Sequence, residues 1–206
     1  MNLLYDKDYI KIINTTDNIA ADIKKILIVN NKRYIWNHVK NVAKTNIVLA
    51  EKFGLDKNLC SIAALGHDIA GIIKPKDMLN YAVKNKLYLD AAEKEYPFLL
   101  HQRFSAIFMK EIFKISDKRI VLPIKYHTTL RNGASNYEMA LFVSDKLSWD
   151  QSGTPPYYDV VNKELNKSIY HASLAYIRYV LDNNMILMPH RWMLEAKVWL
   201  EEYCKD

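Results

Sequence analysis

Glycine and proline are scarce in this chain, and their scarcity limits the folds that it can adopt. The sequence has five glycines and six prolines in 206 residues, too few for the many tight hairpins of a β-rich fold. Apolar residues instead recur at helical spacing along most of the chain. The pattern predicts an all-α fold, a compact single helical bundle of roughly nine to eleven helices.

Start and stop signals give approximate bounds for these helices. The expected helices cover residues 17–29, 32–53, 56–72, 76–85, 98–114, 117–126, 137–149, 158–182 with one interruption, and 192–203. Asp17, Asp56 and Asp117 are placed as start signals, Gly54 as a helix-ending glycine and Pro75 as a first-turn proline. A loop at 128–135 and a break at 151–156 separate the later helices.

The composition is that of an ordinary globular protein, with 50% hydrophobic and 25% charged residues. No apolar run has the length of a membrane span, and the N-terminus lacks the apolar core of a signal peptide. Two cysteines make no disulfide framework, so we expect a cytoplasmic protein. The formal net charge of +6 suits an anionic substrate, or is simply a solvated lysine-rich surface. The lysines form no block typical of nucleic-acid binding.

A His-Asp doublet, His67-Asp68, lies within the apolar stretch SIAALGHDIAGII at 61–73. A carboxylate beside an imidazole in an apolar segment is unfavourable unless something compensates its charge, and a metal ion does so. On a continuous helix the two side chains would point about 100° apart. Both could still reach one ion, and Asp68 could bridge to a second.

Four more side chains complete a candidate set. His38 lies in an amphipathic helix, Asp145 lies in the apolar run LFVSDKLSW, His127 ends an apolar helix, and His101 follows two leucines. A lone histidine on an apolar face is more often a core or capping residue, and a lone buried aspartate is usually a cap or an ion-pair partner. The ordered set His…His-Asp…Asp on a helical pattern is more specific, and it indicates metal-assisted hydrolysis.

With these motifs the chain resembles the HD phosphohydrolase superfamily, and most closely its YqeK type, the symmetrical diadenosine tetraphosphate hydrolases. The matching stretches are 32–56, 63–70, 93–101, 124–129 and 140–150. The resemblance implies an HD domain over residues 17–206 after an N-terminal extension over residues 1–16. The metal ligands that it implies are His38, His67, Asp68, His101, His127 and Asp145. Asp68 and His67 would also be the catalytic residues.

The activity implied by the resemblance is hydrolysis of diadenosine tetraphosphate to two ADP by a metal-activated water. A dinuclear iron centre is typical of the family, although manganese, cobalt, nickel or zinc would suit the same ligands. The candidate substrate-binding residues are Lys74, Arg103, Lys125, Thr128, Thr129 and Arg131. We expect a nucleotide partner, no nucleic acid and no membrane, and a homodimer stays open. His171 and His190 fall outside the set and are interpreted as structural or surface residues.

The residues around the ligands depart from the family pattern. Gly66 replaces a leucine, Gly71 replaces a lysine or arginine, Leu130 replaces a glycine, and Trp149 falls in a stretch where the family has Glu-Pro. Lys74, one turn after Gly71, could supply the missing charge. The departures leave two alternatives, an HD hydrolase of another nucleotide (mono-, tri- or cyclic) and a catalytically silent nucleotide-binding module. Retention of all six ligands argues against the silent module.

Overall fold

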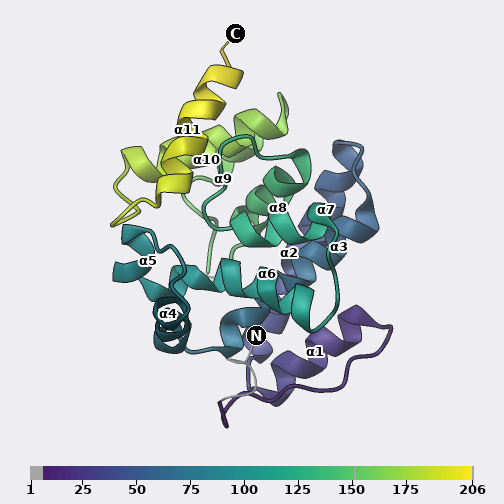
Figure 1. Cartoon of the computed structure of the whole chain (residues 1–206). Coiled ribbons are helices and arrows are strands. Elements are labelled where there is room, and N and C mark those ends of the chain that lie inside the picture. The colour runs from purple at the N-terminus through teal and green to yellow at the C-terminus, as the bar shows by residue number, and fades with distance from the viewer. Residues whose placement is uncertain (1–6, 151, 206) are drawn as a thin grey trace.

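The structure, a computed structural model, describes residues 7–150 and 152–205. Within them the chain forms eleven α-helices, two short 3₁₀ helices and no strand (Figure 1). The elements are α1 Ile19–Val29, α2 Arg33–Lys52, α3 Lys57–Gly66, η2 Ile69–Ile72, α4 Pro75–Lys84, α5 Ala91–Glu95, η3 Pro97–Leu100, α6 His101–Glu111, α7 Lys118–Tyr126, α8 Asn136–Leu147, α9 Tyr158–Glu164, α10 Ile169–Asp182 and α11 Arg191–Tyr203. The predicted all-α class is confirmed. The division into residues 1–16 and 17–206 stays a prediction.

Helix α8 is the central element of the bundle because it is buried around its whole circumference. Every residue from 138 to 144 is buried. Leu141 packs into a core shared with α1, α2, α3, α6 and α7, whereas Met139, Phe142 and Val143 pack into a second core with α9, α10 and α11. Figure 1 shows α8 between these two groups of helices. A polar side chain on this helix is therefore held in a fixed position between two cores.

The prediction of one helix over residues 56–72 is wrong, and the difference affects the His-Asp doublet. Helix α3 starts after the expected cap, Asp56, but it ends at Gly66, and the 3₁₀ helix η2 follows. Asp68 has φ −109° and ψ 12°, which leaves the α-helical path. The doublet therefore follows the end of a helix. The side chains of His67 and Asp68 need not point about 100° apart, as they would on a continuous helix.

Other boundaries differ by smaller amounts. Asn18 rather than Asp17 caps α1, and α5 was not predicted. The predicted helix at 98–114 begins as η3, with α6 starting at His101. The predicted interruption within 158–182 is the break between α9 and α10. Within the described ranges, no helix combines the length and the apolar character that crossing a bilayer requires.

The chain turns sharply after α7 at Leu130, where the resembled family has glycine. Leu130 has φ +59°, in the left-handed region that favours glycine, and its amide donates to Tyr126 O at 2.7 Å. Its side chain is fully buried in the second core. Leu130 therefore adopts a backbone conformation that glycine would adopt without strain. The strain of about 1–2 kcal/mol is offset by burial of the leucine side chain.

We predict that Leu130→Gly is more stable than Leu130→Ala, by about 1 kcal/mol, because both lose the buried side chain but only glycine relieves the strain. Urea unfolding of the two variants measures the difference. Val121, buried inside α7, is the control. There the order should reverse, with Val121→Ala more stable than Val121→Gly. An alanine at position 130 that is as stable as glycine would contradict a strained backbone.

Candidate metal centre

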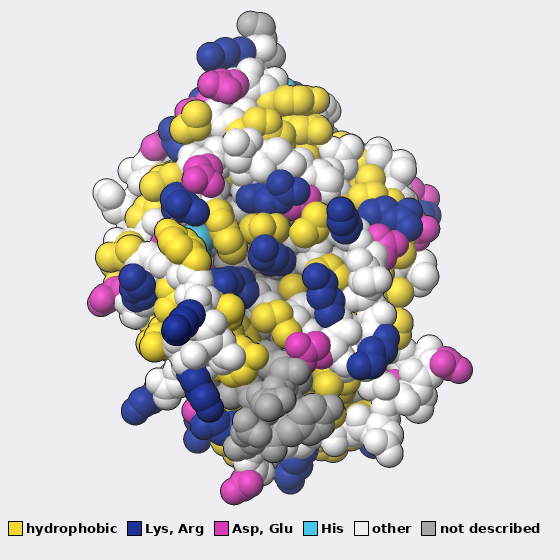
Figure 2. Space-filling model, in the orientation of Figure 1, with side chains coloured by type: hydrophobic (Ala, Val, Ile, Leu, Met, Phe, Trp, Pro, Cys, Tyr) yellow, Lys and Arg dark blue, Asp and Glu magenta, His cyan; other side chains and the backbone are white. Residues whose placement is uncertain are grey.

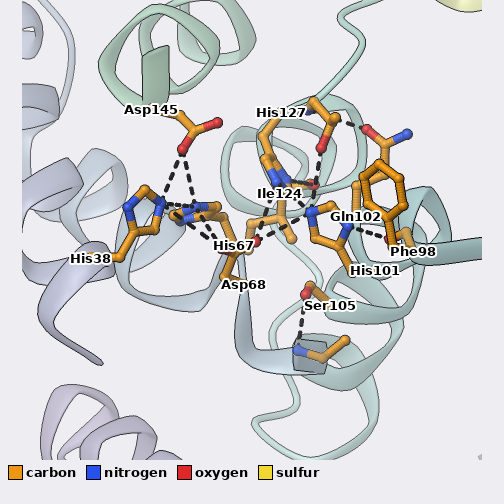
Figure 3. Close-up of polar contacts among 12 residues, drawn as sticks. His38, His67, Asp68, Phe98, His101, Gln102, Ser105, Ile124, His127 and Asp145 are labelled. Atoms are coloured by element: carbon orange, nitrogen blue, oxygen red, sulfur yellow. Dashed lines mark hydrogen bonds and ion pairs between the residues drawn. The ribbon is translucent and has the colours of Figure 1, made fainter. Parts of the chain in front are cut away.

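Five helices contribute to one cluster of histidines and aspartates (Figure 3). The side chains come from the middle of α2 (His38), the end of α3 (His67 and Asp68), the start of α6 (His101), the end of α7 (His127) and the last turns of α8 (Asp145). All six predicted ligands are thus brought together, although they are spread over more than half of the chain.

The first part of the cluster joins His38, His67 and Asp145. His38 Nε2 lies 3.0 Å from Asp145 Oδ1 and 3.3 Å from His67 Nε2, and His67 Nε2 lies 3.6 Å from the same carboxylate oxygen. The three ligand atoms all lie within 4.8 Å of one another. This arrangement, two imidazole nitrogens and one carboxylate oxygen around a common point, can hold one metal ion.

Asp68 connects this group to a second one. Its Oδ2 lies 3.6 Å from His67 Nε2 and 3.8 Å from His38 Nε2, whereas its Oδ1 lies 3.2 Å from His101 Nε2 and 3.4 Å from His127 Nε2. The Nε2 atoms of His101 and His127 are 3.0 Å apart. Each oxygen of one carboxylate therefore faces a different pair of imidazoles.

Three of the histidines are oriented by backbone carbonyls at helix ends. The Nδ1 atoms of His67, His101 and His127 lie 2.7, 2.6 and 2.9 Å from the carbonyl oxygens of Ala64, Phe98 and Ile124, each three residues earlier. The carbonyls of Ala64 and Ile124 lie in the last turn of a helix, where carbonyls lack a partner within the helix, whereas Phe98 O also accepts from the His101 amide. Because a carbonyl only accepts, Nδ1 carries the proton, and in the neutral ring Nε2 presents its lone pair to the centre.

Two charged residues that the sequence analysis missed support the first group. Lys146 Nζ lies 2.6 Å from Asp145 Oδ2 and donates to His127 O at 3.3 Å. Asp150 Oδ2 lies 2.5 Å from His38 Nδ1 as an ion-pair contact without the alignment of a hydrogen bond, so a carboxylate also lies behind the His38 ring. The adjacent opposite charges of Asp145 and Lys146 inside an apolar helix were the available signal for Lys146. Asp150 follows the end of α8, and no sequence pattern marked it.

Burial and neighbouring charges shift the pKa values of all six side chains in the cluster. Burial by itself would raise the pKa of Asp68 and Asp145, but His67 beside Asp68 and Lys146 beside Asp145 hold both pKa values well below the usual range. Burial opposes protonation of His38, His67 and His101, yet the facing carboxylates raise their pKa above 6.5. His127 differs, because burial dominates and lowers its pKa to about 4. Both carboxylates are thus ionised, and positive charge is favoured at their centre.

The donor set fits transition-metal ions. Asp68 Oδ1 is buried and receives no well-aligned hydrogen bond, although His101 Nε2 lies 3.2 Å away. Buried carboxylate oxygens without a donor are uncommon, and a cation satisfies such an oxygen directly. Four imidazoles and two carboxylates match the ligands of iron, manganese, cobalt, nickel and zinc, and the donor types do not select among these metals.

Three of the six candidate substrate-binding residues lie beside the centre. Thr128 Oγ1 is 3.4 Å from His101 Nε2, and the buried Thr129 hydroxyl donates to Gln102 and Leu130 O. Lys74 lies with its ammonium 4.5 Å from the Tyr9 ring centre, in a pocket that Asp68 also lines. A Cβ at Gly71 would lie 2.4 Å from Ile35 Cδ1, so a larger residue at this position would require the end of the Ile35 side chain to move.

The other three candidates make structural contacts. Arg103 pairs with the buried Glu93 at 2.8 Å, and Arg131 pairs with the buried Glu138 at 2.6 Å. The ammonium of Lys125 lies over the rings of Tyr126 and Trp192. Their use as phosphate ligands stays a prediction, and the two arginines would have to leave buried carboxylates to serve as such.

The remaining histidines lie outside the cluster. His171 is half-buried, and its Nδ1 lies 2.8 Å from Ser168 Oγ. His190 is buried and caps α11, where its Nδ1 accepts from the amide of Trp192. Both positions agree with the structural role expected from the sequence.

Two pockets that share Phe98 adjoin the centre. One pocket, of about 300 Å³, includes Thr128 and Lys146 in its lining. The other, of about 590 Å³, includes Asp68 and His101. A long ligand could therefore pass over the centre and extend to both sides.

Comparisons with known proteins give a consistent result. Residues 35–150 match the HD domain family. A Lactococcus lactis protein described as an uncharacterised protein in the pepC 5′ region is 32% identical over 71% of this chain and 75% of its own length. Proteins named symmetrical bis(5′-nucleosyl)-tetraphosphatase are similar in Bacillus subtilis (25% identity, 78% of this chain and 86% of that protein) and Staphylococcus aureus (27%, 75% and 80%).

One solved structure has the same fold. A Clostridium acetobutylicum protein, described as a predicted HD superfamily hydrolase involved in NAD metabolism, aligns with a TM-score of 0.77. The alignment covers 89% of this chain and 97% of that one at 22% identity. At this identity the likeness supports the fold alone.

We predict that the affinity of the centre for Mn²⁺ or Zn²⁺ falls as the pH decreases and the imidazoles gain protons, by roughly tenfold or more per pH unit. The pKa values of His38, His67 and His101 are raised, so protons occupy these rings up to a higher pH and must be displaced by the metal. Calorimetric titration in buffers with different ionisation enthalpies would measure the protons released.

His171→Ala is the control for this titration, because His171 lies outside the cluster and should leave the slope unchanged. Metal affinity that is constant from about pH 5.5 to 8 would show that these imidazoles do not bind the metal.

Proposed function

This chain belongs to the HD domain family, whose hydrolases are metal-dependent, and we propose that it hydrolyses dinucleoside polyphosphates, cutting diadenosine tetraphosphate symmetrically into two molecules of ADP. The names of the similar Bacillus and Staphylococcus proteins support this substrate. A phosphoanhydride is the bond that would be broken.

The observation that carries the proposal is the position of Asp68 between two groups of ligands. One carboxylate oxygen faces His38 and His67, and the other faces His101 and His127. A site for a single ion would not need imidazoles on both sides of Asp68. We therefore propose a dinuclear centre, with iron as the metal by the family resemblance.

Metal ions held by these six residues would supply the Lewis acidity that activates a water and offsets charge on the phosphoryl oxygens. The chain itself orients the reacting groups. Asp68 and the Nε2 atoms fix the position of the centre, because helix-end carbonyls hold three of the rings. Lys146, held by Asp145, places a positive charge at the edge of the first pocket. Thr128 can donate its hydroxyl to a phosphate oxygen beside His101.

The two pockets favour a substrate whose scissile bond lies in its middle. The larger pocket contains Lys32 and Lys74, two ammonium groups that suit a polyphosphate chain. Tyr9 forms part of its wall, with its hydroxyl donating to Asp77 at 2.6 Å and accepting from the amide of Lys74. A mononucleotide would occupy only one side of the centre, whereas a dinucleoside polyphosphate can occupy both.

The surface charge agrees with an anionic substrate. Figure 2 shows Lys and Arg side chains distributed over the face it displays, with fewer acidic ones between them. A positive field of this kind increases the encounter rate with polyphosphates. We propose a nucleotide as the partner and the cytoplasm as the location, and a homodimer is compatible with the proposal.

We predict that Asp68→Ala lowers the turnover of diadenosine tetraphosphate by more than about a thousandfold, because the group between the two sites is lost. The fold should persist, since the Asp68 side chain makes no capping hydrogen bond to η2. Turnover is measured by chromatography of the products, and folding by circular dichroism. Wild-type protein should release ADP alone.

Asp159→Ala, which removes an exposed aspartate from α9, is the matched control and should keep full turnover. Release of ATP and AMP by the wild type would contradict symmetrical cleavage. Failure of fully metallated protein to hydrolyse any dinucleoside polyphosphate would refute the proposed substrate. In that case, hydrolysis of another nucleotide or binding without hydrolysis would identify which alternative applies.

A further inference from the structure

The smaller pocket beside the metal centre is built largely from apolar side chains. Its volume is about 300 Å³, within the range of small-molecule sites. Its lining includes Tyr96 and Phe98 at η3 and a wall of residues 185–188 between α10 and α11. Tyr176 also lines it. The residues at its polar edge, Thr128 and Lys146, are those that adjoin the ligands.

The lining is suited to a flat heteroaromatic ring. Aromatic side chains present π-faces and edges to such a ring, and thioethers make favourable contacts with aromatic groups. Here Tyr96, Phe98 and Tyr176 supply rings, while Met185 and Met188 supply sulfur atoms. An aliphatic ligand would not make the specific contacts that three aromatic rings offer, and a phosphate alone would meet few hydrogen-bond donors in this lining. A nucleobase matches the shape and the chemistry together.

Several of these side chains remain exposed to solvent. Leu187 is 83% exposed and Phe98 is 53% exposed, and Met185 and Met188 are also exposed. Contiguous exposed apolar groups next to a polar centre are typical of ligand sites. The 185–188 wall is nevertheless anchored, because the Met185 amide donates to Val180 O at 2.9 Å and His190 caps the helix that follows. The backbone on both sides of the wall is thus held by hydrogen bonds.

The ammonium of Lys146, at the end of the pocket next to the metal ligands, defines how a nucleotide would lie in the pocket. An ammonium has three donors. Those of Lys146 serve Asp145 at 2.6 Å and His127 O at 3.3 Å, and the ammonium also lies 5.8 Å from the centre of the Tyr176 ring that lines the pocket. The third donor has no hydrogen-bonding partner among the described residues, so a phosphate in the pocket could accept from it. A phosphate beside Lys146 would lie next to the metal centre, with its nucleoside directed outward between Phe98 and the 185–188 wall.

We propose that this pocket binds the nucleobase and ribose of one end of the substrate, between Phe98 and the methionine wall of residues 185–188, with Lys146 contacting the adjacent phosphate. The inference rests on the proposed function and adds the residues that select a nucleoside. The methionine wall lies beyond residue 150, where the match to the HD domain family ends. Nucleoside selectivity would then reside in a segment outside the metal-binding part of the chain.

The test replaces the two methionines by the polar residue closest in size. Metal-loaded Met185→Gln plus Met188→Gln protein is compared with Leu194→Gln plus Val198→Gln protein, whose changes lie on exposed apolar residues of α11 outside the pocket. Calorimetry measures Kd for adenosine, ADP and inorganic tripolyphosphate, and elemental analysis measures the metal content. Steady-state kinetics measures kcat and KM for diadenosine tetraphosphate.

The methionine variant should bind adenosine and ADP about tenfold or more weakly, the range for the loss of a nucleobase contact. KM for diadenosine tetraphosphate should rise to a similar degree while kcat changes little. Tripolyphosphate affinity, metal content and the α11 control should match the wild type. Unchanged adenosine and ADP affinity in the methionine variant, or no binding of either to the wild type, overturns the inference.

The two proposals can fail separately. If the wild type hydrolyses no dinucleoside polyphosphate but binds adenosine through the methionines, the proposed function fails and the nucleoside site is supported. If diadenosine tetraphosphate is cleaved and the methionine variant cleaves it with wild-type KM, the proposed function holds and the nucleoside site is refuted.

Discussion

The hydrogen bonds from three histidine Nδ1 atoms to backbone carbonyls are the interactions on which the centre depends. Each bond joins a ring to the carbonyl three residues earlier, at the end of α3, of η3 or of α7. The carbonyl at each helix end thereby gains a side-chain donor, and the ring gains a fixed orientation and tautomer. Without these bonds, the Nε2 atoms would have no common direction, and the six side chains would form a polar cluster of no defined geometry.

The second constraint is the burial of charge by helix α8. Asp145 follows a run of consecutive buried residues that packs against both cores, so its position is set by the whole bundle. Such a position is unfavourable for a lone carboxylate. Lys146 and His38 lower this penalty from opposite sides, and both contacts hold the carboxylate where the other ligands converge. The stability of the bundle and the geometry of the centre are therefore coupled through one helix.

Much of the fold could be predicted from the sequence because helix caps and apolar periodicity are local signals. Asp56 and Asp117 cap helices as expected, and Pro75 is in a first turn. The continuation of α3 through His67-Asp68 was predicted wrongly, since apolar residues on both sides of the doublet suit a helix and a 3₁₀ turn equally well. The short helix α5 lacks the length that gives a periodic pattern.

The candidate ligands could be identified because their residue types and order are unusual in an apolar chain, and the structure brings them together. What surrounds them depends on contacts between distant segments. The pairing of Arg103 with Glu93 and of Arg131 with Glu138 could not be read from the sequence, so both arginines were predicted as phosphate ligands. The methionine wall was missed for the same reason, because exposed apolar residues in a connecting segment have no distinctive spacing.

The most direct test of the central claim is anomalous X-ray diffraction from crystals of metal-loaded protein, collected at the absorption edge of the metal found by elemental analysis. The proposed dinuclear centre predicts two ions about 3.5–4 Å apart on either side of Asp68, with every histidine ligand bound through Nε2. One ion should contact His38, His67 and Asp145, and the other should contact His101 and His127. A single ion, ligation through Nδ1, or ions bound elsewhere would contradict the account.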